Sequence, residues 1–96
     1  MAYKLLTTRQ FEKDLKRCKK RGLPMDTLKE VINELVANGK VPARFKPHTL
    51  HGNRDGQWKC HILPDWLLIW EQNNRELTLL MLNTGTHADL FGKTKR

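Results

Sequence analysis

The sequence has 96 residues, enough for one hydrophobic core and therefore for a single domain spanning residues 1–96. Hydrophobic residues make up 39% of the chain, which excludes a disordered protein, and a formal net charge of +8 favours a polyanionic partner: nucleic acid, an anionic membrane or an acidic protein. With two cysteines, no apolar N-terminal segment and no apolar run longer than WLLIW, a disulfide scaffold, a signal peptide and a membrane-spanning helix are excluded, and a soluble cytoplasmic protein is expected.

The N-terminal region predicts a short strand at 3–7 followed by a helix that begins near Thr8, where Thr7 and Gln10 resemble a capping box. Phe11, Leu15 and Cys18 recur at helical spacing, so they form a narrow apolar stripe under a broad cationic face. Gly22 is the expected stop. The positions expected to contact phosphates from this face are Lys13, Lys16 and Lys20.

A second helix is expected after Pro24, with Asp26 as its N-cap and Gly39 at its end. Its apolar positions recur every three or four residues: Leu28, Val31, Ile32, Leu35 and Val36. The two helices should form a hairpin. The segment 40–56 has no period and is predicted to be a loop, of a length that is often functional.

From residue 57 the hydrophobic period changes to two. The segment 57–63 alternates, which places Lys59 and His61 on the face opposite Cys60 and Ile62. A turn at Pro64-Asp65 leads to 66–71, apolar on both faces and so a central strand, then to a turn at 72–75 and a third strand at 76–84.

Thr86 is expected to cap a last helical turn. The predicted fold is therefore α+β, in the order β-α-α-β-β-β, with a helical hairpin packed on a small antiparallel meander sheet and a short C-terminal helical turn.

All four histidines, His48, His51, His61 and His87, lie in the second half of the chain. Each alone could be a solvated loop residue, an exposed strand residue or a cap. Together with Lys59 and Asp65 on one face, they would provide a base, a cation and an acid for phosphodiester cleavage without a metal.

Metal binding is the competing interpretation, because His48-Thr-Leu-His51 is an H-x-x-H pattern near Cys60. Cys60 and His61 are adjacent in a strand, however, and so point to opposite faces. The sequence contains neither C-x-x-C nor H-E-x-x-H. No metal and no cofactor are expected.

Three segments, KPHTLHG, CHILPDWLLIW and NTGTHADLFG, occur in an order and spacing that resemble the YafQ-type ribonuclease toxins of the RelE/ParE superfamily. The resemblance implies a toxin that cuts mRNA in the ribosomal A site and is silenced by an antitoxin. It implies a catalytic set that consists of His48, His61, Asp65 and His87.

The resemblance also places Phe91 near the displaced nucleotide. Phe91 would either stack on a base or anchor the tail in the core, and Trp66 is most simply a buried strand residue. The sequence departs from the family pattern at Asn83, where an arginine is expected. Stabilisation of the phosphate anion would then rest on Lys59, with Arg54 from the loop.

As a hypothesis, His87 is the general acid and the base is His48, His61 or Asp65, with a 2′,3′-cyclic phosphate or its 3′-phosphate and a 5′-hydroxyl as products. Expected partners are an acidic antitoxin, the ribosome and mRNA, but not a membrane. Two alternatives remain open: a non-enzymatic, gyrase-inhibiting toxin of the ParE type, and a plain RNA-binding module.

Overall fold

The computed structural model describes residues 2–54 and 56–92. Its elements are, in chain order, β1 (Lys4–Thr7), α1 (Arg9–Lys20), α2 (Met25–Asn38), the 3-10 turn η1 (Ala43–Phe45), β2 (His48–Thr49), the 3-10 turn η2 (Gly52–Arg54), β3 (Gln57–Leu63), β4 (Trp66–Asn73), β5 (Thr78–Gly85) and α3 (His87–Phe91).

The strands form one sheet in the order β1-β5-β4-β3-β2. Strands β2 to β5 are antiparallel to their neighbours, whereas β1 pairs with β5 in parallel, so the sheet is mixed. The predicted α+β class and element order are confirmed. The prediction of a purely antiparallel meander was incomplete, because β1 joins its edge and the expected loop contributes β2.

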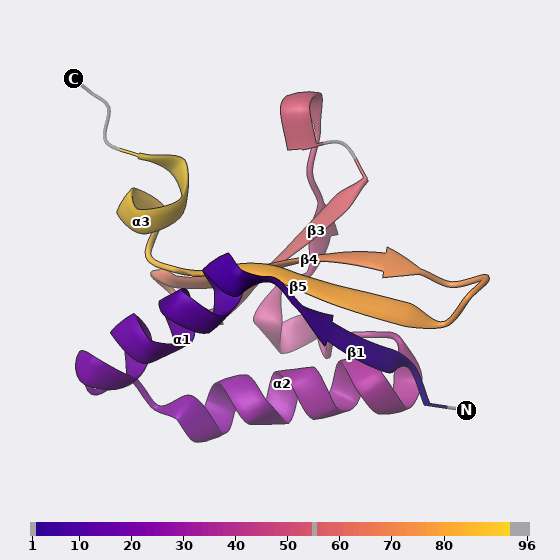
Figure 1. The fold of residues 1–96 in the computed structure, drawn as a ribbon, viewed down its shortest axis with the longest axis horizontal. Coiled ribbons are helices and arrows are strands. Elements are labelled where there is room, and N and C mark those ends of the chain that lie inside the picture. Colours follow the sequence, from indigo (N-terminus) through magenta and orange to yellow (C-terminus); the bar gives the residue numbers. More distant parts are fainter. Residues whose placement is uncertain (1, 55, 93–96) are drawn as a thin grey trace.

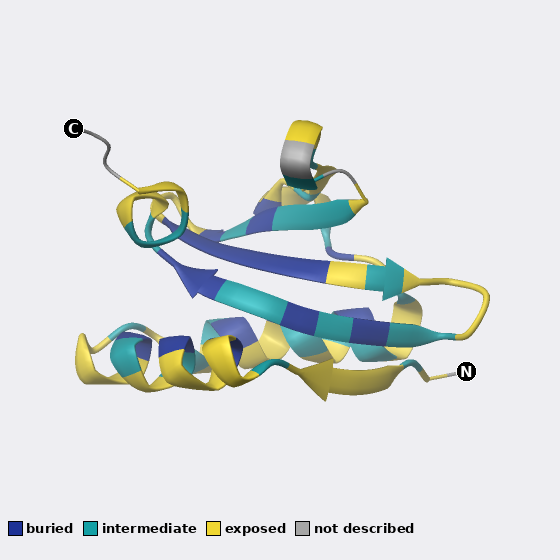
Figure 2. Ribbon diagram, turned by 45° about the horizontal axis from the view of Figure 1, so that its top comes forward, coloured by how far each residue is buried: buried dark blue, intermediate teal, exposed yellow. Residues whose placement is uncertain are grey.

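The two long helices cover one face of the sheet, and α3 and η2 lie on the other side (Figure 1). Strand β4 is central, as predicted, and its residues Trp66 to Trp70 are all buried (Figure 2). Trp66, Leu68 and Trp70 belong to the core shared with the helices, which also contains Phe11 and Leu35. Leu67 and Ile69 are buried as well, although they do not belong to that core cluster.

The helix boundaries follow from local capping. Thr8, not Thr7, caps α1, since its hydroxyl accepts a hydrogen bond from the backbone N–H of Phe11. Helix α2 begins earlier than predicted, with Pro24 at the N-cap position instead of Asp26. It ends at Gly39 as predicted, in the left-handed conformation with φ 70°, and a Cβ there would lie 2.5 Å from the Tyr3 hydroxyl.

Helix α1 also closes the edge of the sheet beyond β1. Strand β1 pairs with β5 only as far as Met81. Further along, the Thr8 hydroxyl donates to the carbonyl of Leu82 at 3.0 Å, and the backbone N–H of Thr84 donates to the Asp14 carboxylate at 3.1 Å. Asp14 is 1% exposed. Polar side chains of a helix thus satisfy the backbone of an edge strand.

Both cysteines are buried and free. Burial raises the pKa of the Cys18 thiol, and it raises the pKa of Cys60 to about 12. Both thiols are therefore held in the neutral form. Within residues 2–54 and 56–92, no helix combines the length and the apolar character that crossing a membrane requires.

Candidate active site

Strand β3 presents Lys59 and His61 on the face of the sheet away from α1 and α2. Their neighbours across β4 are Ile69 and Leu67, respectively, which are both fully buried and form an apolar floor. His48 lies directly opposite Lys59, because β2 pairs with β3 at this register. The predicted alternation of β3 is confirmed, since Cys60 and Ile62 lie in the core on the other face.

Three imidazoles form a row across this face. The ring centroids of His48 and His61 are 6.5 Å apart, and those of His61 and His87 are 5.9 Å apart. His61 is therefore central, with one imidazole on each side. Among the described residues, His51 is exposed and makes no such ring contact. Of the two loop histidines, the structure brings His48 to the site.

The turn at Pro64-Asp65 joins the site to α3. The Asp65 carboxylate accepts hydrogen bonds from His87 twice: from the backbone N–H at 3.0 Å and from Nδ1 at 2.6 Å. His87 is the first residue of α3, whose N-cap is Thr86 as predicted. The pair fixes the orientation of the His87 ring and leaves Nε2 free to act on a substrate.

The other two rings are oriented by backbone carbonyls. Nδ1 of His61 lies 3.3 Å from the Pro64 carbonyl oxygen, and Nδ1 of His48 lies 3.1 Å from that of Lys46. A carbonyl oxygen can only accept, so each Nδ1 carries a proton. In the neutral ring, Nε2 then has the free lone pair that a general base needs.

Electrostatics separate the roles of these groups. Partial burial lowers the pKa of His61; the Pro64 carbonyl opposes this shift, and Lys59 and the two neighbouring histidines reinforce it. The pKa of Asp65 is lowered, above all because the carboxylate accepts hydrogen bonds from His87. At neutral pH the site therefore holds a neutral His61 beside an ionised Asp65.

Phe91 lies close to both cations predicted to contact phosphate. Its ring centroid is 5.4 Å from Lys59 Nζ and 5.5 Å from Arg54 Cζ. Arg54 is also held by Gln57, with Nη1 donating to Oε1 at 3.0 Å. Phe91 is 45% exposed, so the alternative of a core anchor is wrong. Trp66 is 1% exposed, which confirms the simpler interpretation of that residue.

A pocket of about 360 Å³ opens on another side of His61. Arg44, Phe45 and Lys46 line it together with the strand end at Leu63. The Arg44 guanidinium lies 4.5 Å over the Phe45 ring and pairs with Glu30 on α2. Positive side chains therefore lie both beside Phe91 and in this pocket.

Asn83 shares a row of the sheet with the predicted anion-binding residue. Lys59 on β3, Ile69 on β4 and Asn83 on β5 are paired across the strands. The Asn83 amide Nδ2 lies 3.5 Å from Asp14 Oδ2. In this row the positive charge comes from Lys59 alone.

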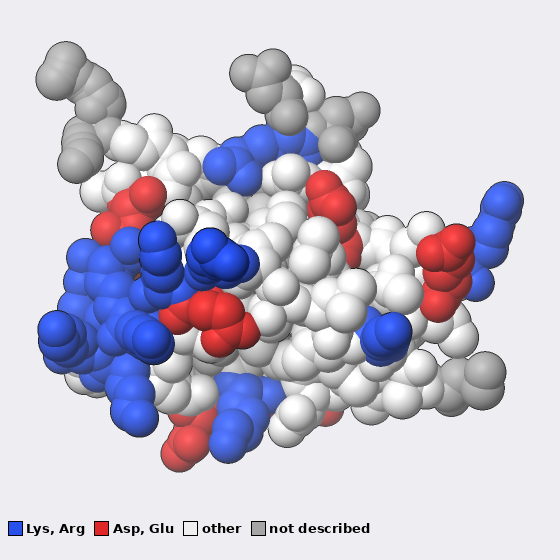
Figure 3. Space-filling view, in the orientation of Figure 1, with Lys and Arg blue, Asp and Glu red and all other residues white. Residues whose placement is uncertain are grey.

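The positive face of α1 forms a separate surface. Lys and Arg side chains gather over α1 (Figure 3), which lies on the side of the sheet opposite α3 (Figure 1). The three lysines predicted to contact phosphates are exposed there: Lys13, Lys16 and Lys20. The structure does not bring them into the histidine site, so a contact with RNA would use a second face of the molecule.

Sequence reasoning missed a group of charged residues behind the site: Asp14, Arg17, Arg21 and Asp89. One signal was available, because Thr86-x-x-Asp89 is a capping-box pattern, and the structure contains that box. The described residues include no group of three or more His, Cys, Asp or Glu arranged to hold a metal ion.

Comparison with known proteins gives consistent matches. A family model described as the bacterial toxin of type II toxin-antitoxin system, YafQ, matches residues 3–92. The mRNA interferase toxin YafQ of Escherichia coli K12 is 39% identical over 84 residues, which cover 86% of this chain and 89% of that protein.

Solved structures agree. The crystal structure of YafQ from E. coli BL21(DE3) matches with a TM-score of 0.87 at 35% identity, covering 94% of this chain and 99% of that one. The toxin in the crystal structure of the E. coli DinJ-YafQ toxin-antitoxin complex matches with a TM-score of 0.86 at 35% identity, covering 96% and 100%.

Proposed function

This chain belongs to the YafQ family of bacterial toxins from type II toxin-antitoxin systems and is an mRNA interferase, and we propose that it cuts ribosome-bound mRNA by acid–base catalysis with its own side chains. Family membership confirms the resemblance found in the sequence. The observation that carries the proposal is the His87–Asp65 pair beside His61, with 5.9 Å between the two imidazoles. A gyrase inhibitor or a plain RNA-binding module has no need of this set.

The proposed step is an internal transesterification. A base removes the proton of the 2′-hydroxyl, whose oxygen attacks the neighbouring phosphorus. The bond from phosphorus to the 5′-oxygen breaks, and an acid protonates the departing oxygen. The products are a 2′,3′-cyclic phosphate, which water can open to a 3′-phosphate, and a 5′-hydroxyl. The reaction needs one proton acceptor and one donor, placed on either side of the phosphate.

His61 is the base in this proposal. Its pKa is lowered, so the ring is neutral at neutral pH, and its Nδ1 faces the Pro64 carbonyl, which leaves Nε2 as the acceptor. Asp65 is unsuited, because the oxygen that accepts from the His87 backbone also accepts from the His87 ring. His48, 6.5 Å from His61, is the second candidate for the base.

His87 is the acid. Asp65 holds its Nδ1, so Nε2 faces outward with the proton that the leaving oxygen needs. The ionised carboxylate also balances the positive charge of a protonated ring. This gives Asp65 a role through His87, comparable to that of the carboxylate in other oriented imidazole pairs.

Lys59 and Arg54 stabilise the negative charge that develops on the phosphate, since both cations lie near Phe91 at the edge of the site. Phe91 is exposed and offers its ring for stacking on a base. On the other side of His61, the pocket containing Arg44 and Lys46 gives the RNA strand a second positively charged place to lie.

A cognate antitoxin is the expected partner, because E. coli YafQ has been solved in complex with the antitoxin DinJ. We propose that this antitoxin is acidic, since the chain carries a net charge of +8 and exposes Lys13, Lys16 and Lys20 on α1. In its absence, the same lysines would contact ribosomal RNA. A cytoplasmic location, where both partners would be met, is part of this proposal.

The test is cleavage of a defined mRNA on programmed ribosomes, with the ends mapped chemically. Wild type should leave a 5′-hydroxyl end and cut the same mRNA much more slowly without ribosomes. His87→Ala should lose about 10²- to 10⁴-fold in rate while it still binds ribosomes, and His61→Ala should lose a similar factor. His51→Ala, the matched control, changes an exposed loop histidine outside the row and should cut normally.

Equal cleavage of free and ribosome-bound mRNA would refute ribosome dependence. A His87→Ala protein that cuts at the wild-type rate would refute the assignment of the acid. If His48→Ala loses far more activity than His61→Ala, the base is His48. Adding the acidic neighbour encoded beside the toxin should block cleavage and co-purify with the chain, and failure of both would refute the proposed partner.

A further inference from the structure

Helix α3 carries the proposed acid, but none of its residues belongs to the apolar core or packs against it. The helix has five residues, none of them buried. A helix this short has almost no stability of its own in water. Its position must therefore come from specific contacts made by its side chains and its first turn.

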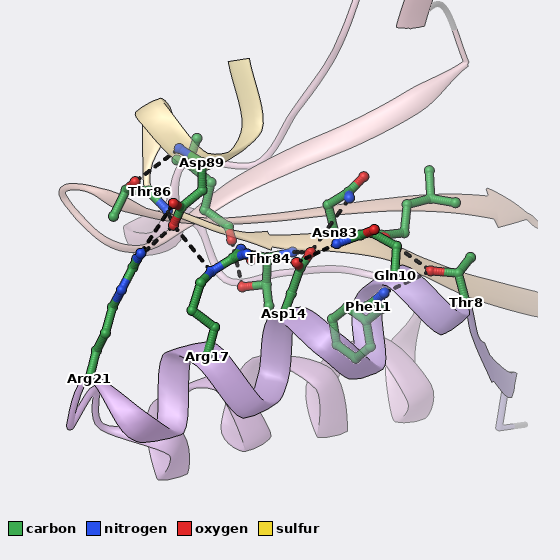
Figure 4. A network of polar contacts seen from close by, with 12 residues as sticks. Thr8, Gln10, Phe11, Asp14, Arg17, Arg21, Asn83, Thr84, Thr86 and Asp89 are labelled. Atoms are coloured by element: carbon green, nitrogen blue, oxygen red, sulfur yellow. Dashed lines mark hydrogen bonds and ion pairs between the residues drawn. The ribbon is translucent and has the colours of Figure 1, made fainter. Parts of the chain in front are cut away.

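Asp89 makes most of those contacts (Figure 4). Its Oδ2 accepts from the backbone N–H of Thr86 at 3.0 Å, and its backbone N–H donates to the Thr86 hydroxyl at 3.1 Å. The same carboxylate accepts from both ends of the Arg21 guanidinium, from Nη1 at 2.7 Å and from Nη2 at 3.3 Å. Arg17 Nε lies 3.7 Å away.

Arg17 lies in the last turn of α1, and Arg21 is the C-cap residue of that helix. Arg17 is itself held there, because its Nη2 donates to buried Asp14 at 3.0 Å. The Arg21–Asp89 bond connects residues 68 positions apart in the sequence and joins the C-terminal end of α1 to α3. A paired, two-point contact of a guanidinium with a carboxylate fixes direction as well as distance.

The backbone beneath Asp89 is fitted to this arrangement. A Cβ on Gly85 would lie 2.8 Å from Asp89 Oδ2, 2.9 Å from Asp89 Cβ and 3.1 Å from Arg17 Nη2. The absence of a side chain at residue 85 thus lets the carboxylate approach the strand and meet the arginines. A substitution there would displace Asp89 without changing any charge.

We propose that Arg21 and Asp89 are positioning residues for His87: their ion pair fastens α3 to α1 and so sets where the imidazole lies. The first turn of α3 is held at two points, by Asp65 at His87 and by Arg21 at Asp89. Without the second point, the helix turns about the first, and Nε2 leaves the line to the 5′-oxygen. This inference rests on the proposed function, in which His87 is the acid.

The test compares substitutions that remove the same charge at neighbouring sites. Asp89→Asn keeps an oxygen for the cap of α3 but removes the ion pair, and Arg21→Gln removes it from the other side. Arg21→Lys keeps the positive charge but cannot make the two-point contact of a guanidinium with the Asp89 carboxylate. Lys19→Gln is the matched control, because Lys19 is exposed on the same turn of α1. Gly85→Ala perturbs the contact with no change of charge.

Two readouts are needed. In the ribosome assay, Asp89→Asn, Arg21→Gln and Gly85→Ala should lower kcat by about 10- to 10²-fold and leave KM nearly unchanged, because the misplaced group acts in the chemical step. Arg21→Lys should be intermediate, and Lys19→Gln normal. Independently, a ¹³C NMR titration should show the pKa of Asp65 rising toward its ordinary value in the first three variants, but not in Lys19→Gln.

The two readouts distinguish failure of the positioning role from failure of the proposed function. If wild type cuts and the three variants match it in kcat, the positioning role is refuted, whatever happens at Asp65. If wild type itself does not cut, the proposed function fails, and the titration alone decides whether the ion pair positions His87: an unchanged Asp65 refutes the role and a raised pKa supports it.

Discussion

Replacing Asp14 by alanine should destabilise the protein strongly, because this carboxylate is buried and serves several donors. It accepts from the backbone N–H of Thr84, from Arg17 and from Gln10. Thr84 is fully buried, so its N–H loses its partner with no water to replace it, at a cost of about 1–3 kcal/mol. Gln10 is exposed and simply returns to water.

Arg17 contributes less than its short bond suggests. Its side chain is 36% exposed and keeps the carbonyl of Thr84 and the carboxylate of Asp89 within reach. Its loss is therefore about 1 kcal/mol. Alanine has a higher helix propensity than aspartate, which stabilises α1 by about 0.5 kcal/mol and offsets part of these losses. The net change in the free energy of unfolding is about 1.5–3.5 kcal/mol, which lowers the melting temperature of a domain of this size by about 6–28 °C.

Thermal unfolding followed by circular dichroism measures this change. Asp14→Asn should fall in between, because its amide oxygen still accepts from Thr84. Glu30→Ala is the matched control: this carboxylate pairs with Arg44 but is 51% exposed, so its loss should be less than about 1 kcal/mol. A melting temperature of Asp14→Ala no lower than that of Glu30→Ala would refute the reasoning that buried hydrogen bonds anchor α1 to β5.

Three further results are expected. In a plot of kcat/KM against pH, the midpoint of the acidic limb should lie below the ordinary histidine pKa of about 6.5, because the base works when deprotonated and burial lowers the pKa of His61. A midpoint at or above that value would contradict the assignment of His61 as the base. Reversing the charges of Lys13, Lys16 and Lys20, which are exposed on α1, should weaken ribosome binding and reduce the slope of log affinity against log salt concentration by about 2–3. Unchanged affinity at every salt concentration would assign this face to solubility or to the antitoxin alone. The hydrogen bond from Arg21 is the main cause that lowers the pKa of the Asp89 carboxyl, so the ionised group stabilises the fold above about pH 4, and this contribution is lost as the pH falls further. On acidification, Asp89→Asn should therefore lose less of its melting temperature than wild type does. An equal loss in the two proteins would count against the ion pair.

The sequence carried the parts of this fold that depend on local pattern. The apolar run at Trp66 could be read as a central strand, because only a strand covered on both faces tolerates it. The alternation around His61 gave the face of that side chain, and the spacing from Pro64 placed Asp65 at the turn. The candidate set of histidines and aspartate was therefore available before the structure, although their distances were not.

Other features depend on contacts between distant segments. Asp14 looked like one more polar residue of an exposed helix face, but its main partner is the backbone of Thr84, 70 residues away. The parallel pairing of β1 with β5 leaves no periodic signal in either strand. Phe91 could equally have filled the core, because its exposure depends on where α3 lies. Asp89 of that helix pairs with Arg21, 68 residues away in the sequence, and no local pattern predicts such a contact.

The parallel pairing of β1 with β5 also constrains when the molecule becomes active during its synthesis. Residues 4–7 are made first, yet their strand partner is residues 78–81. The nascent chain can form the helical hairpin early, because its contacts are local, but β1 waits for nearly the whole domain to follow. If the Arg21–Asp89 pair positions His87 as proposed, the imidazole is aligned only after that late closure. On the proposed mechanism, the nuclease site of a nascent chain stays unassembled until β1 has paired with β5.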